Sequence, residues 1–391
     1  MQEALEGPLL ALENDSLRRA LRAPLLRAYS AAEGDPEALI NFGSNDYLGL
    51  AEEPFIAQAA IEAVGRYGTG AGASRLICGN HAPHAALEEA LAAWKGTEAA
   101  LAFSSGYATA LGTIPSLIGP QDVVILDKLC HACIIDGARL SGAVLRIFPH
   151  NNLDRLETHL QWARKRHPKA RILVATESIF SMDGDLAPLA AIVALKERYG
   201  AWLMVDEAHA AGVLGATGGG LAQALGLGGR IEIQMGTLSK ALGCSGGYIV
   251  GSRTLVDWLI NKARSLIFST APAPASAATA TASVRWMSTE AAHERRALLW
   301  TNVALFQKTW PELAAAQSPI APVLVGGNEE TLRLSKRLLA AGFFVPAIRY
   351  PTVPRGRERL RVTISARHSA DSIQRLTVAL RAGLGTLDGP Q

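Results

Sequence analysis

Short apolar runs along the chain end in polar residues and alternate with helical patterns. The runs lie at 123–126, 172–175, 203–205 and 231–235, and helical periodicity appears at 153–166 and 189–199. Strands that alternate with helices of this length predict an α/β fold with a mostly parallel sheet flanked by helices. Ligands bind such sheets at the carboxyl ends of the strands. Four polar residues fall at these ends: Asp206, His209, Thr237 and Lys240.

The sequence also predicts how the chain divides into domains. A stretch rich in Ala, Pro, Ser and Thr at 271–284 predicts the passage out of the large domain, and short strands and helices follow it. Because 391 residues exceed the usual size of one core, we expect more than one domain. The predicted parts are an N-terminal helical segment over 1–45, a large cofactor-binding domain over 46–285 and a smaller C-terminal α+β domain over 286–391. The first part contains a basic amphipathic stretch that predicts a helix at 17–29.

Composition narrows the class of protein. Hydrophobic residues make up 49 % and charged residues 19 % of the chain, which is typical of a globular protein. A net charge of +3 gives no electrostatic reason to expect nucleic-acid binding. Apolar runs stay well short of the roughly 18 residues of a membrane span, and the acidic N-terminus differs from a signal peptide. We therefore expect a cytoplasmic protein with neither a membrane nor a nucleic acid as partner.

Lys240 and Asp206 together predict one cofactor. Lys240 ends a turn of small residues at 236–240, and Asp206 ends an apolar run. A lysine amine can form a Schiff base with an aldehyde, and a carboxylate can keep a pyridine nitrogen protonated, which indicates pyridoxal phosphate (PLP). A solvated lysine and a helix-capping aspartate are the alternatives. His209 could reach the phenolic oxygen of the same ring.

Other polar residues could complete such a site. The segment 104–107 precedes a predicted helix at 108–117, and hydroxyls and amides at a helix N-terminus can bind phosphate; an ordinary N-cap is the alternative. Thr237 and Ser239 could add hydroxyls. His131 could stack on a planar ring or be an ordinary buried histidine. In the predicted strand at 359–364, either Arg359 or Arg361 could bind a carboxylate through two parallel hydrogen bonds.

Two short motifs suggest other chemistry. Residues 130–133 form a C-x-x-C, but a zinc site needs a second pair of ligands, and Cys78 and Cys244 are isolated. We interpret the motif as two buried cysteines on either side of His131, the histidine that could stack on a planar ring, and we expect no metal site. Residues 68–73 contain G-x-G-x-x-A, a dinucleotide fingerprint only between a strand and a helix. A helical pattern precedes it, so we expect a loop.

Five segments, taken in order, resemble the α-oxoamine synthases, a family of fold-type I PLP-dependent transferases. They are NFGSNDYLGL at 41–50, FSMDGDLAPL at 180–189, DEAH at 206–209, GTLSK at 236–240 and AIRYPTVP at 347–354. The segments at 105–107 and 351–354 are most similar to the members that condense L-alanine with a pimeloyl thioester in biotin synthesis. Cys130 and Cys133 stand where relatives commonly have serine, and Glu207 where many have aspartate.

The resemblance implies a role for each candidate residue. Lys240 carries the cofactor as a Schiff base, Asp206 pairs with the ring nitrogen, and His131 stacks on the ring. The catalytic residues implied are Lys240, Asp206, His209 and His131. The implied cofactor-binding residues are Gly106, Tyr107, His131, Ser181, Asp206, His209, Thr237, Lys240 and, toward a neighbouring subunit, Thr270. The implied substrate-binding residues are Arg19, with Arg18 and Arg22 as alternatives, and Asn45, His131, Thr352 and Arg361.

The implied enzyme is a homodimeric acyltransferase with shared sites. It would join L-alanine to a pimeloyl thioester of coenzyme A (CoA) or a carrier protein, giving 8-amino-7-oxononanoate, the free thiol and carbon dioxide. Another α-oxoamine synthase is the first alternative, making aminoketobutyrate (a glycine C-acetyltransferase), aminolevulinate or, like serine palmitoyltransferase, a long-chain ketosphingoid. An aminotransferase and a catalytically silent scaffold are further alternatives.

Overall fold

The chain divides into two compact units. The computed structural model describes residues 2–19, 21, 39–311 and 317–385. The central unit comprises Asn45–Ser181 and Asp185–Ala297, and the terminal unit comprises Met1–Ser44, Met182–Gly184 and Leu298–Gln391. Helix α12, Glu290–Thr309, begins in the central unit and ends in the terminal unit. The division into three segments inferred from the sequence stays a prediction.

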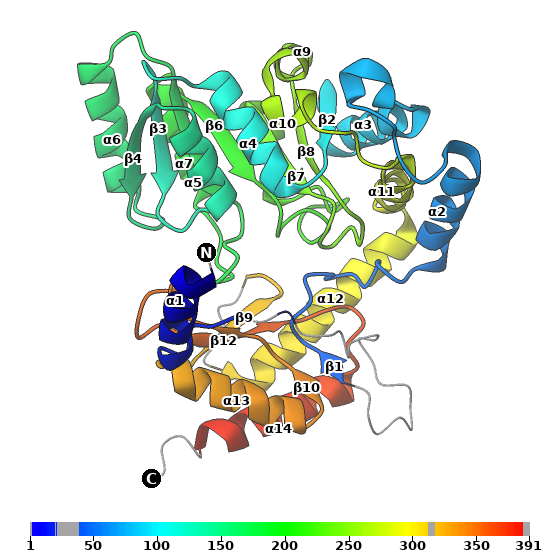
Figure 1. Ribbon diagram of the computed structural model, residues 1–391, viewed down its shortest axis with the longest axis vertical. Helices are drawn as coiled ribbons and strands as arrows, with labels where there is room; N and C mark the ends of the chain where they lie inside the picture. Colours follow the sequence, from blue (N-terminus) through cyan, green and yellow to red (C-terminus); the bar gives the residue numbers. More distant parts are fainter. Residues whose placement is uncertain (1, 20, 22–38, 312–316, 386–391) are drawn as a thin grey trace. The chain divides into compact units, whose positions relative to one another are not determined.

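A seven-stranded sheet forms the centre of the central unit, every residue of which is described. Its strand order is β2-β8-β7-β6-β5-β3-β4 (Figure 1). Strand β8 runs antiparallel to both of its neighbours, and the other neighbouring pairs are parallel. The strands are β2 Ala99–Phe103, β3 Val123–Asp127, β4 Val144–Phe148, β5 Ile172–Glu177, β6 Trp202–Asp206, β7 Ile233–Thr237 and β8 Gly247–Gly251. The predicted mostly parallel sheet is confirmed.

Helices connect and cover these strands. They are α2 Pro54–Tyr67, α3 Ala82–Lys95, α4 Gly106–Leu117, α5 Ala132–Leu140, α6 Leu153–Arg166, α7 Leu189–Arg198, α8 Leu221–Ala224, α9 Arg253–Lys262, α10 Arg264–Ile267 and α11 Pro274–Trp286, with the short turns η1 Arg75–Gly79 and η2 Gly228–Arg230. Helix α11 occupies most of the Ala- and Ser-rich stretch 271–284, and its small buried residues pack against α2 and α3. Helix α2 precedes the G-x-G-x-x-A motif, so the motif lacks the strand that a dinucleotide site requires.

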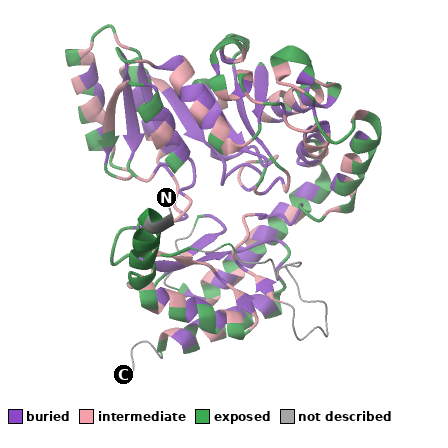
Figure 2. Ribbon diagram, in the orientation of Figure 1, coloured by how far each residue is buried: buried purple, intermediate pink, exposed green. Residues whose placement is uncertain are grey.

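Strands β3, β5 and β6 of the central unit are buried on both faces, as Figure 2 shows for β3 and β6. Side chains alternate between the two faces along a strand. On one face Ala175 of β5, Met204 of β6 and Met235 of β7 join a cluster with residues of α4, α5 and α9, such as Ile114 and Ile134. Burial on both faces explains why these strands appear in the sequence as continuous apolar runs.

The described part of the terminal unit contains a small antiparallel sheet and packed helices. The order of this sheet is β11-β12-β9, and β1 pairs separately with β10 in parallel. The elements are α1 Gln2–Asn14, β1 Ile40–Asn41, β9 Ile320–Leu324, α13 Asn328–Ala340, β10 Phe343–Phe344, β11 Ala347–Ile348, β12 Arg359–Thr363 and α14 Ala370–Gly385. Helix α13 contacts α14 and strands β10, β11 and β12. The predicted smaller α+β domain is confirmed as an architecture.

The helix predicted at 17–29 is wrong where the structure describes it. Helix α1 ends at Asn14, and Leu17 to Arg19 are not helical. Ser16 has φ 55°, a left-handed conformation that ends a helix. The N–H groups of Leu17 and Arg18 both donate to the carbonyl of Leu12, at 2.7 and 2.8 Å. Residues 22–29 lie outside the described residues.

Helix length bears on membrane association. Among residues 2–19, 21, 39–311 and 317–385, no helix is both long and apolar enough to cross a bilayer.

Candidate functional site

Three strands of the central sheet end in polar residues on the same face. Glu177 ends β5, Asp206 ends β6 and Thr237 ends β7. Each follows by two positions a residue of the cluster that packs with α4 and α5, so its side chain points to that face. The strand register pairs Glu177 with Asp206 directly. The carboxyl edge of the sheet therefore gathers these groups, as the sequence predicts for Asp206 and Thr237.

A chain of contacts joins Lys240 to three further residues. The Nζ atom of Lys240 lies 3.0 Å from Nε2 of His209. The other ring nitrogen of His209, Nδ1, lies 2.5 Å from the hydroxyl of Tyr47, and Tyr47 donates to Oδ1 of Asn45 at 3.5 Å. Tyr47 is fully buried. Three residues named from the sequence, Lys240, His209 and Asn45, are thus brought together through one that was not.

Asp206 is a buried acid with a cationic neighbour. Burial raises its pKa, while the charge of Lys240 and the N–H of Ala208 lower it. The Ala208 N–H donates to Oδ1 at 2.9 Å. A buried carboxylate is stable only beside a cation or donors, and Lys240 supplies such a cation. A protonated ring nitrogen would supply another.

Glu177 belongs to the same site and was not predicted. Burial, with the charge of Asp206, raises the pKa of Glu177 to about 8, against the lowering effect of Lys240 and of hydrogen bonds from the backbone N–H groups of His131 and Ser181. Its Oε1 atom is buried and has no hydrogen-bond partner in the described structure. The buried pair therefore favours a state in which one of the two acids keeps its proton. The position of Glu177 at the end of an apolar run, like that of Asp206, was the signal in the sequence.

The start of helix α4 presents backbone donors. Ser105 is the N-cap, and its hydroxyl accepts from the Ala108 N–H at 3.0 Å. The first N–H groups of a helix, here those of Gly106 and Tyr107, have no carbonyl partner within the helix. The Tyr107 hydroxyl donates to Asp136. The helix start therefore offers amides with a partial positive charge, which favours an anion.

Thr237 lies beside that helix start. A Cβ atom placed on Gly106 would lie 3.6 Å from Cβ of Thr237. The Thr237 hydroxyl lies 2.8 Å from that of Ser239 and donates to the carbonyl of Gly246 at 2.9 Å. Two hydroxyls and the first amides of α4 thus gather within the unit that carries Lys240. This donor set suits a phosphate group.

A doubly paired histidine holds the loop that carries Ser181. His150 lies between two carboxylates, with Nδ1 3.1 Å from Asp127 and Nε2 2.7 Å from Asp185. Its ring packs edge-on against Phe180, with centroids 4.3 Å apart. Burial opposes protonation, but hydrogen bonds to both carboxylates outweigh it and raise the pKa of His150 to about 10. His150 is thus a cation that fixes the loop from Phe180 to Asp185.

This pair of contacts predicts a pH-dependent contribution to stability. The folded pKa of His150 is raised from 6.5 to about 10, so the contribution is complete below pH 6.5 and disappears as pH rises to about 10. We expect His150→Gln to lower the free energy of unfolding by about 1–3 kcal/mol at pH 6.5, because the buried Asp127 keeps its two backbone N–H donors but loses its cationic partner. Denaturant unfolding should show this difference shrinking toward pH 10. His293→Gln, at an exposed position of α12, is the control. A difference that stays constant over this range would contradict the assignment.

Two of the candidate substrate residues in the terminal unit are in direct contact. Arg19 donates from Nη2 to the Thr352 hydroxyl at 3.2 Å, although 333 positions separate them. Arg361 is buried and donates to the Thr363 hydroxyl at 2.9 Å. Arg359 is also buried but forms an ion pair with Asp183 at 2.7 Å. The two arginines that the sequence left equivalent therefore have different surroundings, since Arg359 pairs with a carboxylate of its own unit and Arg361 contacts a hydroxyl.

The remaining candidates are placed as follows. Arg18 pairs with Glu13 at 2.5 Å, and Arg22 lies outside the described residues. Thr270, in the central unit, is exposed and forms an isolated antiparallel bridge with Ser74.

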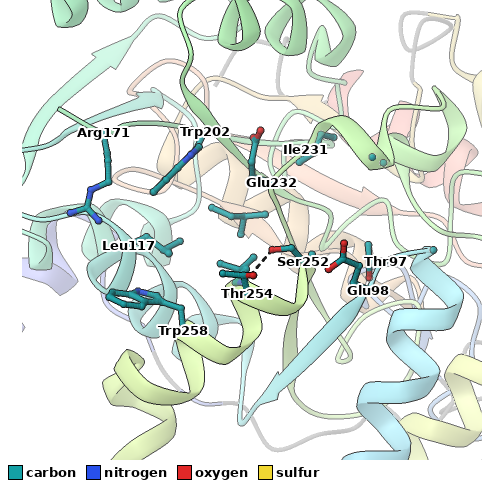
Figure 3. A pocket seen from close by; sticks show the side chains of 16 residues that line it. Thr97, Glu98, Leu117, Arg171, Trp202, Ile231, Glu232, Ser252, Thr254 and Trp258 are labelled. Carbon is teal, nitrogen blue, oxygen red and sulfur yellow. Dashed lines mark hydrogen bonds between the residues drawn. The ribbon is translucent and has the colours of Figure 1, made fainter. Parts of the chain in front are cut away.

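The central unit also has a cavity of about 640 Å³ away from these residues (Figure 3). Its walls include Trp202, at the start of β6, and Ile233, at the start of β7. The cavity therefore lies at the amino edge of the parallel strands, opposite the edge that carries Lys240. None of the residues predicted for the site lines it.

The residues present fit PLP. An amine, a buried carboxylate and a group of amide and hydroxyl donors all belong to the carboxyl edge of one sheet. Lys240 would hold the aldehyde carbon, Asp206 the ring nitrogen, and the start of α4 with Thr237 the phosphate. The buried pair Glu177 and Asp206 would bind a positively charged ring nitrogen better than a neutral group.

Comparison with known proteins supports this interpretation. The family model for aminotransferase class I and II matches residues 37–380. The 8-amino-7-oxononanoate synthase of Geobacter sulfurreducens is 45 % identical over 384 residues, which cover 97 % of each chain. A structure of a serine palmitoyltransferase with PLP has a TM-score of 0.83 at 34 % identity and covers 88 % of each chain. The 8-amino-7-oxononanoate synthase of Francisella tularensis has a TM-score of 0.76 at 25 % identity over 90 % of this chain and 99 % of that one.

Proposed function

Because this chain belongs to the class I and II aminotransferase family and is a PLP-dependent acyltransferase, we propose that it condenses L-alanine with a pimeloyl thioester. The products would be 8-amino-7-oxononanoate, carbon dioxide and the free thiol of CoA or of a carrier protein, in biotin synthesis. Relatives of this name at about 45 % identity along almost the whole chain support the choice of reaction. A cytoplasmic location remains a prediction from the sequence.

One observation carries the chemical part of the proposal. Lys240 and His209 are in contact at 3.0 Å, and the buried Asp206 is close enough for the charge of Lys240 to lower its pKa. An amine that exchanges a proton with an imidazole can act first as a nucleophile and then as a base. These residues come from the ends of neighbouring strands β6 and β7 and the turns that follow them.

Each residue of the central-unit site has a separate role in the proposed reaction. When bound, PLP supplies an aldehyde that condenses with amines and a ring that withdraws electrons. Asp206 holds a proton on the ring nitrogen. Lys240 takes the Cα proton of alanine at Nζ and later returns a proton, with His209 beside it. The start of α4 and Thr237 bind the phosphate, and Ser181 and His209 bind near the phenolic oxygen.

Substrate residues complete the proposal. We assign Arg361 to the carboxylate of alanine, which a guanidinium can bind through two hydrogen bonds. Arg19, Asn45 and Thr352 are assigned to the substrates, and His131 to the face of the cofactor ring. The contact between Arg19 and Thr352 supports their assignment to one substrate.

A homodimer with shared sites is also part of the proposal. Leu76, Ile77 and Phe268 are exposed by 51 %, 78 % and 70 %, and the last of these lies near Thr270 in the chain. Large apolar side chains so exposed on one unit suit a protein interface. A second copy of the chain would bury them and receive Thr270 at its phosphate site. Sedimentation giving only the mass of one chain would contradict this.

A serine palmitoyltransferase-like reaction is the second candidate, since structures of such enzymes are similar to this chain with TM-scores up to 0.85. An assay of L-alanine, glycine and L-serine against acetyl-, pimeloyl- and palmitoyl-CoA separates the two. We expect the highest kcat/KM for L-alanine with pimeloyl-CoA, by about tenfold or more over other pairs, with release of carbon dioxide and thiol. A preference for serine with palmitoyl-CoA would replace the proposed function.

A further inference from the structure

The C-x-x-C motif at 130–133 has a place beside the site, although the proposed chemistry does not use its sulfurs. Cys130 and Cys133 are exposed by only 5 % and 1 %, whereas the residue between them, His131, is partly buried and reaches the surface. Burial raises the pKa of both thiols well above the ordinary value. Redox exchange and metal binding require thiolates. Because both thiols stay protonated, the two cysteines act as neutral S–H groups. The described residues also contain no group of three or more potential metal ligands.

Both donors of Cys133 converge on one nitrogen of His131. The Cys133 N–H donates to Nδ1 at 3.3 Å, which makes His131 the N-cap of α5. The Sγ atom of Cys133 lies 3.0 Å from the same Nδ1. A nitrogen that accepts from an N–H presents its lone pair and carries no hydrogen. The S–H group is therefore a second donor to the single lone pair of Nδ1, and each of the two donors favours the tautomer that carries the ring proton on Nε2.

We propose that the thiol of Cys133 is a positioning group that holds the neutral ring of His131 with its proton on Nε2. Its consequence for the reaction rests on the proposed function, in which His131 lies against the cofactor. The Nδ1 edge is then fixed on helix α5, and the exposed part of the ring offers a hydrogen-bond donor in a constant orientation. A cationic ring would need a proton on Nδ1, where it would clash with two donors.

The charges that face His131 agree with a neutral ring. Burial lowers its pKa most, and the charge of Lys240 also lowers it, while the charges of Asp206 and Asp136 raise it. The neighbouring thiol of Cys133 adds no charge because it stays protonated. His131 thus acts as a donor through Nε2 and does not serve as a cation.

The test compares Cys133→Ser, which keeps a donor, with Cys133→Ala, which keeps only the N–H. Long-range ¹H–¹⁵N spectra of PLP-loaded protein labelled at histidine, with His131 assigned through His131→Asn, report the tautomer and pKa directly. We expect the Nε2–H form alone in the wild type and in Cys133→Ser between pH 6 and 9. In Cys133→Ala we expect a detectable Nδ1–H form and a raised pKa of His131.

Kinetics provide the second measurement. Loss of one hydrogen bond should lower kcat of Cys133→Ala about fivefold with little change in KM, while Cys133→Ser stays within about twofold. An Nδ1–H form in the wild type, or a tautomer and pKa unchanged in Cys133→Ala, would overturn the proposal. The spectra do not depend on which substrates react, so failure of the proposed function would leave this result intact. Far-ultraviolet circular dichroism confirms that both variants fold.

Discussion

Replacement of Lys240 with alanine is expected to abolish turnover and covalent attachment of PLP. The residue provides the amine at the carboxyl edge of the sheet, 3.0 Å from His209, and methyl cannot form a Schiff base or move a proton. Loss of a group that acts as nucleophile and base should lower kcat by about 10⁴-fold or more. Borohydride reduction followed by peptide mass analysis should place the cofactor on Lys240 in the wild type and on no residue in the variant.

The matched control is Lys169→Ala, at an exposed position in the turn after α6. It removes the same charge from the same unit and should change neither attachment nor turnover. Lys240→Ala should remain folded, since the side chain is only half-buried and Asp206 keeps the N–H donor of Ala208. Turnover of Lys240→Ala near the wild-type rate, with the cofactor attached elsewhere, would remove the basis of the proposed function.

Replacement of Asp206 with asparagine is expected to separate activity from stability. The ring nitrogen of PLP would lose its charged partner, and breaking a buried ion pair costs about 3–5 kcal/mol, or about 10²- to 10⁴-fold in kcat/KM. Lys240 is unaltered, so the cofactor should still be attached covalently. Because burial already raises the pKa of Asp206, the protein without PLP should be no less stable after the substitution.

Asp257→Asn, at an exposed position of α9, is the control for a change of net charge. Steady-state kinetics, borohydride trapping and denaturant unfolding without PLP measure the three expected outcomes. A variant with wild-type kcat/KM would show that Asp206 does not bind the ring nitrogen. Equal losses of stability and activity would assign Asp206 to folding instead.

Local sequence patterns determined most of the central sheet. The apolar runs of β3, β5 and β6 are contiguous in the chain, and burial on both faces requires such runs. The placement of Asp206 and Lys240 also followed from the sequence, because the carboxyl ends of parallel strands share one edge. The prediction of a helix at 17–29 was wrong because the chain leaves the helical conformation at Ser16, which is left-handed. A serine gives no clear signal of that conformation in the sequence.

The tertiary structure alone decided which distant residues meet. Tyr47 and His209 are 162 positions apart, and no periodicity links them. The same holds for the ion pair of Arg359 with Asp183. It holds too for the acid pair of Glu177 and Asp206, which depends on the register of two strands. Sequence patterns encode the conformation of neighbouring residues, whereas the pKa of a buried group depends on burial and on charges supplied by other segments. The chemistry of the predicted residues therefore became specific only once the fold had placed their partners.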